Sequence, residues 1–305
     1  MTARINAIVP YFGGKRTMAP LIVDELGKHT QYFEPFCGSM AVLFAKLPSQ
    51  KETVNDLHGD LINLARVLQQ QDEAEKLYDR LGRTLFSQGV LEQARVELGD
   101  EQVFPPGPAG TVLPDRAYWY FLASWMGRNG TAGTARVDYQ MAVRWTKGGG
   151  SPTVRFRNAV DSIPWWHERL RNVVILKRDA FSILNRFEDV AGTAIYVDPP
   201  YAADTRSLGR RKNGAGGKYK HEFDHGGGMF GDDHSRLAAA LRDYKKARIV
   251  VSYYDSPRIR ELYQGWTFVE HTRQKHLHAQ NGRGARPKEA PEVLIINGPS
   301  YAVAA

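Results

Sequence analysis

Residues 31–40 read Gln-Tyr-Phe-Glu-Pro-Phe-Cys-Gly-Ser-Met, a short apolar and aromatic run followed by a glycine turn. This stretch predicts a strand over 31–36, a turn at 37–39, and a helix over 40–47 that Pro48 ends. A second strand over 52–55 and a periodic helix over 59–70 follow. Because strand and helix alternate from the start, we expect an α/β fold with a parallel sheet.

The alternation stops near residue 70 and returns near Pro164. We expect helices over 72–98 and 115–126, an irregular stretch over 104–110, and a basic, glycine-rich segment without a clear period over 127–157. Strands are then predicted at 173–176, 194–197 and 248–252, helices at 180–187 and 232–245, and a closing pair of strands at 266–270 and 293–297. The predicted organisation is one α/β domain made of residues 1–69 and 164–305, interrupted by a mainly helical insert over 70–163.

Composition is that of an ordinary globular protein, with 42% hydrophobic and 24% charged residues in 305. No stretch approaches the ~18 uncharged apolar residues that a membrane helix needs. Cys37 is the one cysteine, so no disulfide forms within the chain, and we expect a reducing, cytoplasmic setting. His221, His225 and His234 lie close in sequence, but neither their spacing nor a thiolate partner points to zinc, so no metal is expected.

The net charge of +8 favours a polyanionic partner, nucleic acid first, although a merely basic soluble protein fits the total equally well. The distribution of charge is more informative. Lysine and arginine dominate three glycine-rich segments, 127–157, 205–220 and 271–288, which we expect to be loops.

The glycine turn at Gly38 follows a predicted strand and precedes a helix, the place where nucleotide-like cofactors bind in doubly wound sheets. Asp56 comes eighteen residues later, at the end of the second predicted strand, where it can accept hydrogen bonds from ribose hydroxyls. A tight turn and a helix-capping aspartate explain the same residues equally well.

Asp198-Pro199-Pro200-Tyr201 follows the predicted strand 194–197 and carries a more specific signal. The two prolines fix an extended path, so the Asp198 carboxylate and the Pro199 carbonyl can both accept hydrogen bonds from one exocyclic amine. The Tyr201 ring offers a face on which a base can stack. A purely structural turn is the competing interpretation.

Tyr11-Phe12-Gly13-Gly14-Lys15 is a third candidate motif. Lys15 could meet a carboxylate or a phosphate, but the motif is too short for a P-loop, and a plain loop fits as well.

Taken together and in this order, the motifs resemble those of the Dam-type (D12 class) DNA adenine-N6 methyltransferases. The resemblance rests on Tyr11–Lys15, Glu34-Pro35-Phe36-Cys37-Gly38-Ser39, Asn55-Asp56, Lys177-Arg178-Asp179-Ala180-Phe181, Asp198–Tyr201 and the last strand Glu292–Asn297. It implies a class I S-adenosylmethionine-dependent methyltransferase fold (a Rossmann-like sheet) with a DNA-recognition insert, and S-adenosylmethionine as cofactor.

The resemblance also implies roles for residues. Gly38 and Ser39 match the positions that approach the methionine part of the cofactor, Asp56 the ribose acceptor, and Asp179 the acceptor for the cofactor's adenine amine. The full expected cofactor-binding set is Tyr11, Lys15, Glu34, Phe36, Gly38, Ser39, Asp56, Asp179 and Asp198. Met40 departs from the family, which usually has a second glycine there; its side chain would then have to point away into the core.

The chemistry of the Asp198 turn agrees with such a reaction. Hydrogen bonds from an adenine N6 amine to Asp198 and Pro199 would localise the nitrogen lone pair for attack on the sulfonium methyl, and positioning and electrostatics would supply much of the rate. The base must first leave the duplex stack, at a cost of roughly a few kcal/mol, and Tyr201 would stack on it. The expected catalytic residues are Asp198, Pro199, Pro200 and Tyr201. Cys37 is expected to be a small buried residue rather than a nucleophile.

Double-stranded DNA is the expected partner. Arg128, Asn129 and Arg136 resemble the family's recognition loop, and the loop over 205–220, with Arg206, Arg211 and Lys212, follows the catalytic turn. A solvated basic loop is the alternative for each of these cations. The sequence leaves open a cytosine-N4 or RNA amino methyltransferase, and a degenerate homologue that binds DNA without turnover. A monomer, acting alone or beside a separate restriction nuclease, suits a short site read one strand at a time.

Overall fold

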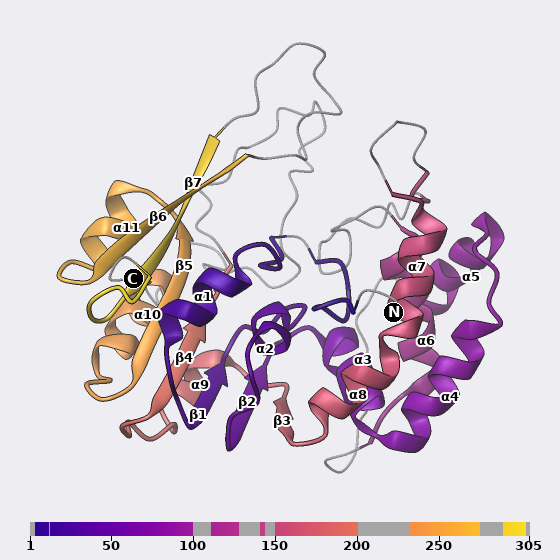
Figure 1. The fold of residues 1–305 in the computed structure, drawn as a ribbon, viewed down its shortest axis with the longest axis horizontal. Coiled ribbons are helices and arrows are strands. Elements are labelled where there is room, and N and C mark those ends of the chain that lie inside the picture. The colour runs from indigo at the N-terminus through magenta and orange to yellow at the C-terminus, as the bar shows by residue number, and fades with distance from the viewer. Residues whose placement is uncertain are drawn as a thin grey trace. The chain divides into compact units, whose positions relative to one another are not determined.

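The computed structural model describes residues 4–11, 13–99, 111–127, 141–143, 150–200, 232–274 and 289–302 (Figure 1). The chain divides into two compact units. The first unit is made of residues 1–20, 37–180 and 217–221, and the second of residues 21–36, 181–216 and 222–305.

The first unit combines a pair of parallel strands with most of the helices. Strand β2 (Lys51–Asn55) pairs with β3 (Val173–Leu176), and the register runs from Glu52 opposite Val173 to Asn55 opposite Leu176. The helices are α2 (Ala41–Ala45), α3 (Gly59–Gln69), α4 (Gln71–Gly82), α5 (Gln88–Leu98), α6 (Pro114–Met126), α7 (Pro152–Asp161) and α8 (Ile163–Leu170). Helix α6 packs against α3 and α5, so its aromatic side chains are buried except that of Trp119, which is half-buried.

An aromatic cluster joins these helices to the N-terminal segment. Phe121 and Trp125 of α6 lie against Trp166 of α8, and the two indole rings stack at 6.4 Å between centroids. The indole N–H of Trp125 donates to the Ile8 carbonyl at 3.0 Å, and that of Trp166 to the Ile5 carbonyl at 2.7 Å. Both buried donors are thereby satisfied, and the N-terminal segment is fixed to the unit.

A buried ion network joins β2 to α8. The Glu52 carboxylate accepts hydrogen bonds from Lys46 and from both terminal nitrogens of Arg169. Burial by itself raises the pKa of Glu52, but the hydrogen bonds and charges of the two cations outweigh it, so the pKa lies below its usual value. The carboxylate is therefore charged in the folded protein.

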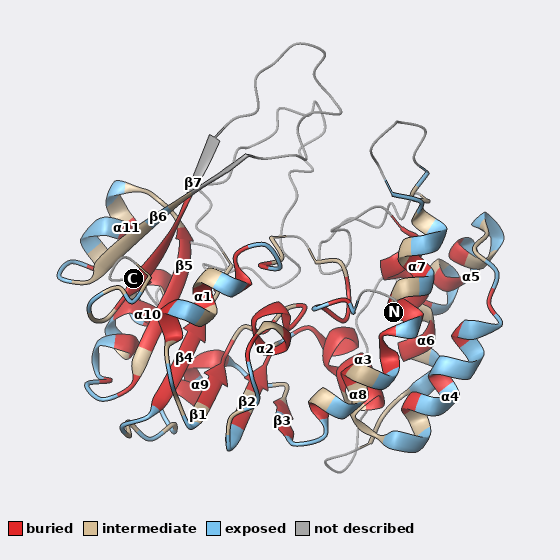
Figure 2. Ribbon diagram, viewed as in Figure 1, coloured by how far each residue is buried: buried red, intermediate tan, exposed pale blue. Residues whose placement is uncertain are grey.

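The second unit contains the other five strands, in the order β1-β4-β5-β7-β6. Strands β1 (Gln31–Glu34), β4 (Thr193–Val197) and β5 (Arg248–Tyr254) run parallel, whereas β7 (Glu289–Ile296) is antiparallel to both β5 and β6 (Thr267–Gln274). Its helices are α10 (Asp233–Arg242) and α11 (Pro257–Leu262). Helices α1 (Ala19–Leu26) and α9 (Ala180–Leu184) each begin in the first unit and continue in the second. Strands β4 and β5 are almost wholly buried, as the red ribbon in Figure 2 shows.

The predicted α/β character is confirmed, since each expected strand is present within a few residues of its predicted bounds. Three local predictions were wrong. The helix expected over 72–98 is two helices, because α4 ends at Gly82 and Leu85 is 73% exposed rather than buried. Helix α7 begins at Pro152, inside the segment expected to be irregular. Helices α1 and α11 had not been predicted at all. The division into residues 1–69, 70–163 and 164–305 stays a prediction. No helix among the described residues is long and apolar enough to cross a membrane.

Candidate active site

The glycine turn of the first unit connects the end of β1 to α2. Gly38 has φ 44° and Met40 has φ 61°, so two nearby residues take the left-handed conformation. The Met40 N–H donates to the Cys37 carbonyl at 2.7 Å, and the Cys37 N–H donates to the Asn55 carbonyl at 2.8 Å. Met40 is fully buried and Cys37 nearly so, which confirms that both side chains pack into the core.

Asp56 holds this turn through its side chain. Its Oδ2 accepts the Gly38 N–H and its Oδ1 accepts the His58 N–H, each at 2.9 Å. Burial raises the pKa of Asp56 above its usual value, and the backbone N–H donors partly oppose that rise. The Leu57 N–H is a third backbone donor to this carboxylate, which has about four acceptor sites, so the side chain that shapes the turn can still accept from a ligand hydroxyl.

The Tyr11–Lys15 segment lies against the same turn. The Ile8 N–H donates to the Ser39 carbonyl at 3.2 Å, and the Tyr11 ring lies 3.4 Å from the position that a Cβ would take on Gly38. Lys15 is buried, and its Nζ donates to the Gly13 carbonyl at 3.0 Å. The Tyr11 ring therefore packs beside the Gly38 backbone, at ordinary contact distance from the place that a Cβ would take.

Asn55 connects the turn to the segment that carries Asp179. Its Nδ2 donates to the Arg178 carbonyl and its Oδ1 accepts the Arg178 N–H, both at 2.9 Å. Asp179 follows directly and is exposed. Sequence reasoning included Asn55 in the motif but assigned it no role; a buried amide at the last residue of a strand is the one signal that could have suggested a backbone bridge.

The second unit contributes the ends of β1 and β4. In the register of this parallel pair, Phe33 lies opposite Ile195, so Glu34 and the Asp198 turn emerge at the same edge. Glu34 is buried, and its Oε2 accepts the Tyr32 hydroxyl at 2.9 Å. Asp198 and Pro200 are half-buried, and Pro199 is buried.

A buried hydroxyl pair lies behind this edge. The Tyr196 hydroxyl and Ser252 Oγ are 2.6 Å apart, and both side chains are almost fully buried. Burial, and then the negative charge of Asp198, raise the pKa of Tyr196 well above its usual value. The phenol is therefore neutral at physiological pH, and either hydroxyl can be the donor in the pair.

The expected site residues fall into two groups, one in each unit. The first unit holds Tyr11, Lys15, Gly38, Ser39, Asp56 and Asp179, and the second holds Glu34, Phe36, Asp198, Pro199 and Pro200. Tyr201 and the expected DNA-binding residues Arg128, Asn129, Arg136, Arg206, Arg211 and Lys212 lie outside the described residues.

Histidine had been weighed as a metal ligand. His234 is buried, and its Nδ1 lies 2.9 Å from the Tyr253 hydroxyl. Among the residues described here, no group of three or more histidine, cysteine or acidic side chains could hold a metal ion.

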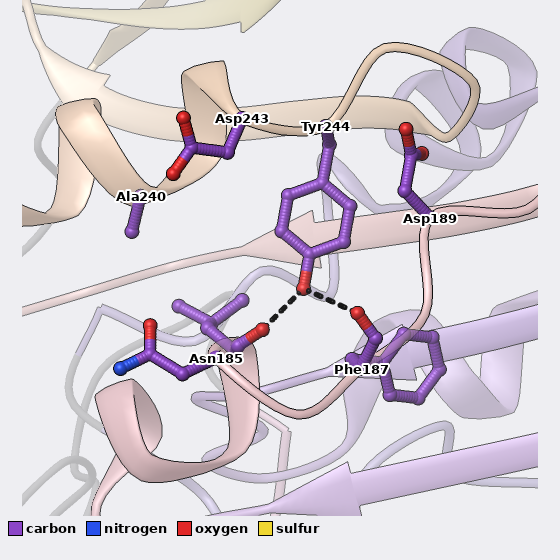
Figure 3. Close-up of a pocket in the computed structure, with 7 residues that line it drawn as sticks. Asn185, Phe187, Asp189, Ala240, Asp243 and Tyr244 are labelled. Atoms are coloured by element: carbon purple, nitrogen blue, oxygen red, sulfur yellow. Dashed lines mark hydrogen bonds between the residues drawn. The ribbon is translucent and has the colours of Figure 1, made fainter.

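A pocket of about 330 Å³ in the second unit lies apart from these residues (Figure 3). It is lined by the segment after α9 and by the end of α10, and Tyr244 donates to the carbonyls of Leu184 and Phe187 at its base. These segments lead into the first residues of β4 and β5, whereas Glu34 and Asp198 follow the last residues of their strands. The pocket is therefore at the opposite edge of the parallel strands from the candidate catalytic turn.

Comparison with known proteins gives a consistent result. Residues 11–96 match the model of a family described as D12 class N6 adenine-specific DNA methyltransferase. The chain is 26% identical to the Retron Ec67 DNA adenine methylase of Escherichia coli, over 96% of this chain and 92% of that protein. It is also 26% identical to the type II methyltransferase M1.LlaDCHI of Lactococcus lactis subsp. cremoris, over 96% of this chain and 95% of that protein. The mixed α/β fold is consistent with the class I methyltransferase fold, and the resemblance drawn from the motifs is confirmed.

Proposed function

We propose that this chain, whose residues 11–96 match the model of the D12 class N6 adenine-specific DNA methyltransferases, transfers a methyl group from S-adenosylmethionine to the N6 amine of an adenine flipped out of a short, specific duplex sequence. The observation that carries the proposal is the Asp198-Pro199-Pro200 turn directly after β4, at the same edge of the strands as Glu34.

The residues of the first unit would hold the cofactor. The side-chain-free backbone at Gly38 would accept close approach of the methionine part, Asp56 would accept from the ribose hydroxyls, and Asp179 from the adenine amine. Two observations support this fit: the left-handed turn at Gly38, which has no side chain on its backbone, and the Asp56 carboxylate, which backbone N–H groups hold in place.

The cofactor, when bound, supplies a methyl group on a positively charged sulfur. Asp198 and the Pro199 carbonyl would accept the two N–H groups of the adenine amine, which withdraws the nitrogen lone pair from the ring. When the nitrogen takes the methyl group, the Asp198 carboxylate would accept the surplus proton from that nitrogen. Tyr201 would stack on the extruded base.

Residues 70–163 would form the target-recognition insert. In the described part of that range the chain forms helices α4 to α7, and no strand was found there. The Arg128–Arg136 segment would read base edges, whereas Arg206, Arg211 and Lys212 would hold phosphates beside the flipped nucleotide.

The test is methyl transfer from labelled S-adenosylmethionine to unmethylated plasmid, with the product nucleosides resolved by mass spectrometry. Wild type should give N6-methyladenine, and Asp198→Ala should lower the rate by about a hundredfold or more, as loss of a transition-state hydrogen-bonding group does. Asp243→Ala is the matched control, because it removes an exposed carboxylate from the same unit at the end of α10 and should keep full activity. N4-methylcytosine as the product, or an Asp198→Ala variant as active as the control, would overturn the proposal.

A further inference from the structure

Asn55 is an almost fully buried amide at the last position of β2, where the pairing with β3 ends opposite Leu176. Its side chain continues the connection beyond the strand, because the amide bonds both the N–H and the carbonyl of Arg178, two residues past the end of β3. A side-chain amide that satisfies both backbone groups of one residue imitates a strand neighbour, and so it fixes the path of the chain at that residue.

The same residue is also fixed to the glycine turn. Its backbone carbonyl accepts the Cys37 N–H at 2.8 Å, and the next residue, Asp56, accepts the Gly38 N–H. Asn55 is therefore bonded on one side to the segment that holds Gly38 and on the other to the segment that ends in Asp179. Strand β2 thus contacts both of these segments, which are about 140 residues apart in the chain.

We propose that Asn55 is a positioning residue for the adenine ring of the cofactor: by bridging Arg178 it holds Asp179 at a fixed distance from the Gly38 turn and Asp56. This inference rests on the proposed function, because it takes Asp179 to be the acceptor for the adenine amine. Asp179 is the residue directly after Arg178, so the bridge limits where its backbone can lie.

The experiment measures binding of S-adenosylhomocysteine and of its analogue lacking the 6-amino group, by isothermal titration calorimetry, without any DNA. Wild type should prefer the amine-bearing ligand by roughly tenfold, the effect of one hydrogen bond to a charged acceptor. Asn55→Ala should weaken binding of S-adenosylhomocysteine and lower this preference severalfold. Asp179→Ala should abolish the preference, and adding Asn55→Ala to it should not change the ratio further.

Asn63 offers a matched control in the same unit. Its side chain makes the same two-bond bridge, with Nδ2 on the Leu113 carbonyl at 2.9 Å and the Leu113 N–H on Oδ1 at 2.8 Å, but it joins α3 to the start of α6. Asn63→Ala therefore removes an equivalent pair of bonds and should leave the ratio of the two affinities unchanged. If Asn55→Ala does not fold, Asn55→Ser, whose shorter side chain cannot make both bonds, is measured in its place with the same expectation.

The outcomes separate the inference from the function on which it rests. A wild-type preference that survives Asn55 substitution, with both affinities reduced equally, would show that the bridge is only structural and would refute the inference alone. If wild type binds neither ligand, the proposed function fails as well. A preference that falls in the Asn55 variant and persists in the Asn63 variant is the result expected.

Discussion

Met40 lies in the turn after Gly38, and the backbone strain at this position can be measured by comparing the stabilities of its glycine and alanine variants. We expect glycine to be the more stable replacement, which is the reverse of the usual order. The residue is buried, yet it has φ 61°. A Cβ in this conformation costs about 1–2 kcal/mol relative to glycine, whereas replacing alanine by glycine in an ordinary helix costs about 0.5–1 kcal/mol. The two effects oppose each other, so Met40→Gly should be more stable than Met40→Ala by about 0.5–1 kcal/mol.

Both variants should be less stable than wild type, by about 2–5 kcal/mol, because each removes a fully buried methionine side chain. The relevant quantity is therefore the difference between the two variants, in which this common loss cancels. Urea unfolding followed by far-ultraviolet circular dichroism and by tryptophan fluorescence gives the free energies, provided that the two transitions coincide.

Leu43 in α2 is the control for this comparison, because it is equally buried but lies in a regular helix. Leu43→Ala should be more stable than Leu43→Gly, by about 0.5–1 kcal/mol, the reverse of the order at Met40. If alanine is the more stable replacement at both positions, the left-handed conformation assigned to Met40 is not strained, and the reasoning is refuted.

Three further predictions follow from the contacts described. Glu52→Gln should destabilise the protein by about 3–5 kcal/mol at pH 7, because it leaves Arg169 without its buried counter-charge. Since the folded-state pKa of Glu52 is lowered, the stability difference between wild type and variant should be full above pH 4.5 and should shrink as the pH falls further. Urea titrations that show a pH-independent difference would contradict this explanation. Asp56→Ala should weaken binding of S-adenosylhomocysteine by tenfold or more, as measured by calorimetry. The reason is that the variant loses both a hydrogen-bond acceptor for the ligand and the side chain that bonds the backbone of the Gly38 turn. Unchanged affinity would show that Asp56 is not part of the cofactor site. Ser252→Ala should cost about 1–3 kcal/mol by leaving the Tyr196 hydroxyl buried without this partner, and adding Tyr196→Phe should recover much of that loss; equal stability of the single and double variants would argue against the pair.

The elements that carry the candidate site could be predicted because their signals are local. A buried strand before two prolines marks the end of β4, and an aromatic run before a glycine marks the end of β1. The closing strands are also where they were expected, and the antiparallel register places Thr267 opposite Ile296.

What could not be predicted depends on contacts distant in sequence or on competition at helix ends. Leu81 and Leu85 have helical spacing, but α4 ends after Gly82 and the Thr84 hydroxyl bonds back to the Arg80 carbonyl, so the second leucine is exposed. The Asn55 bridge joins residues 55 and 178, and no local pattern announces such a pair. The left-handed conformation of Met40 is also invisible in sequence, since methionine ordinarily avoids it.

The pairing of β1 with β4 has a consequence for how the protein is made. Gln31 lies opposite Thr193, so the partner of β1 is synthesised about 160 residues later. At ribosomal speeds of about 5–20 residues per second, β1 waits roughly 10 to 30 seconds for that partner to leave the ribosome. During this interval Tyr32 and Phe33, both buried in the finished fold, lack the strand that later pairs with them. We therefore expect the nascent chain to depend on chaperones more than the finished enzyme does. For the same reason, expression at low temperature should improve the soluble yield.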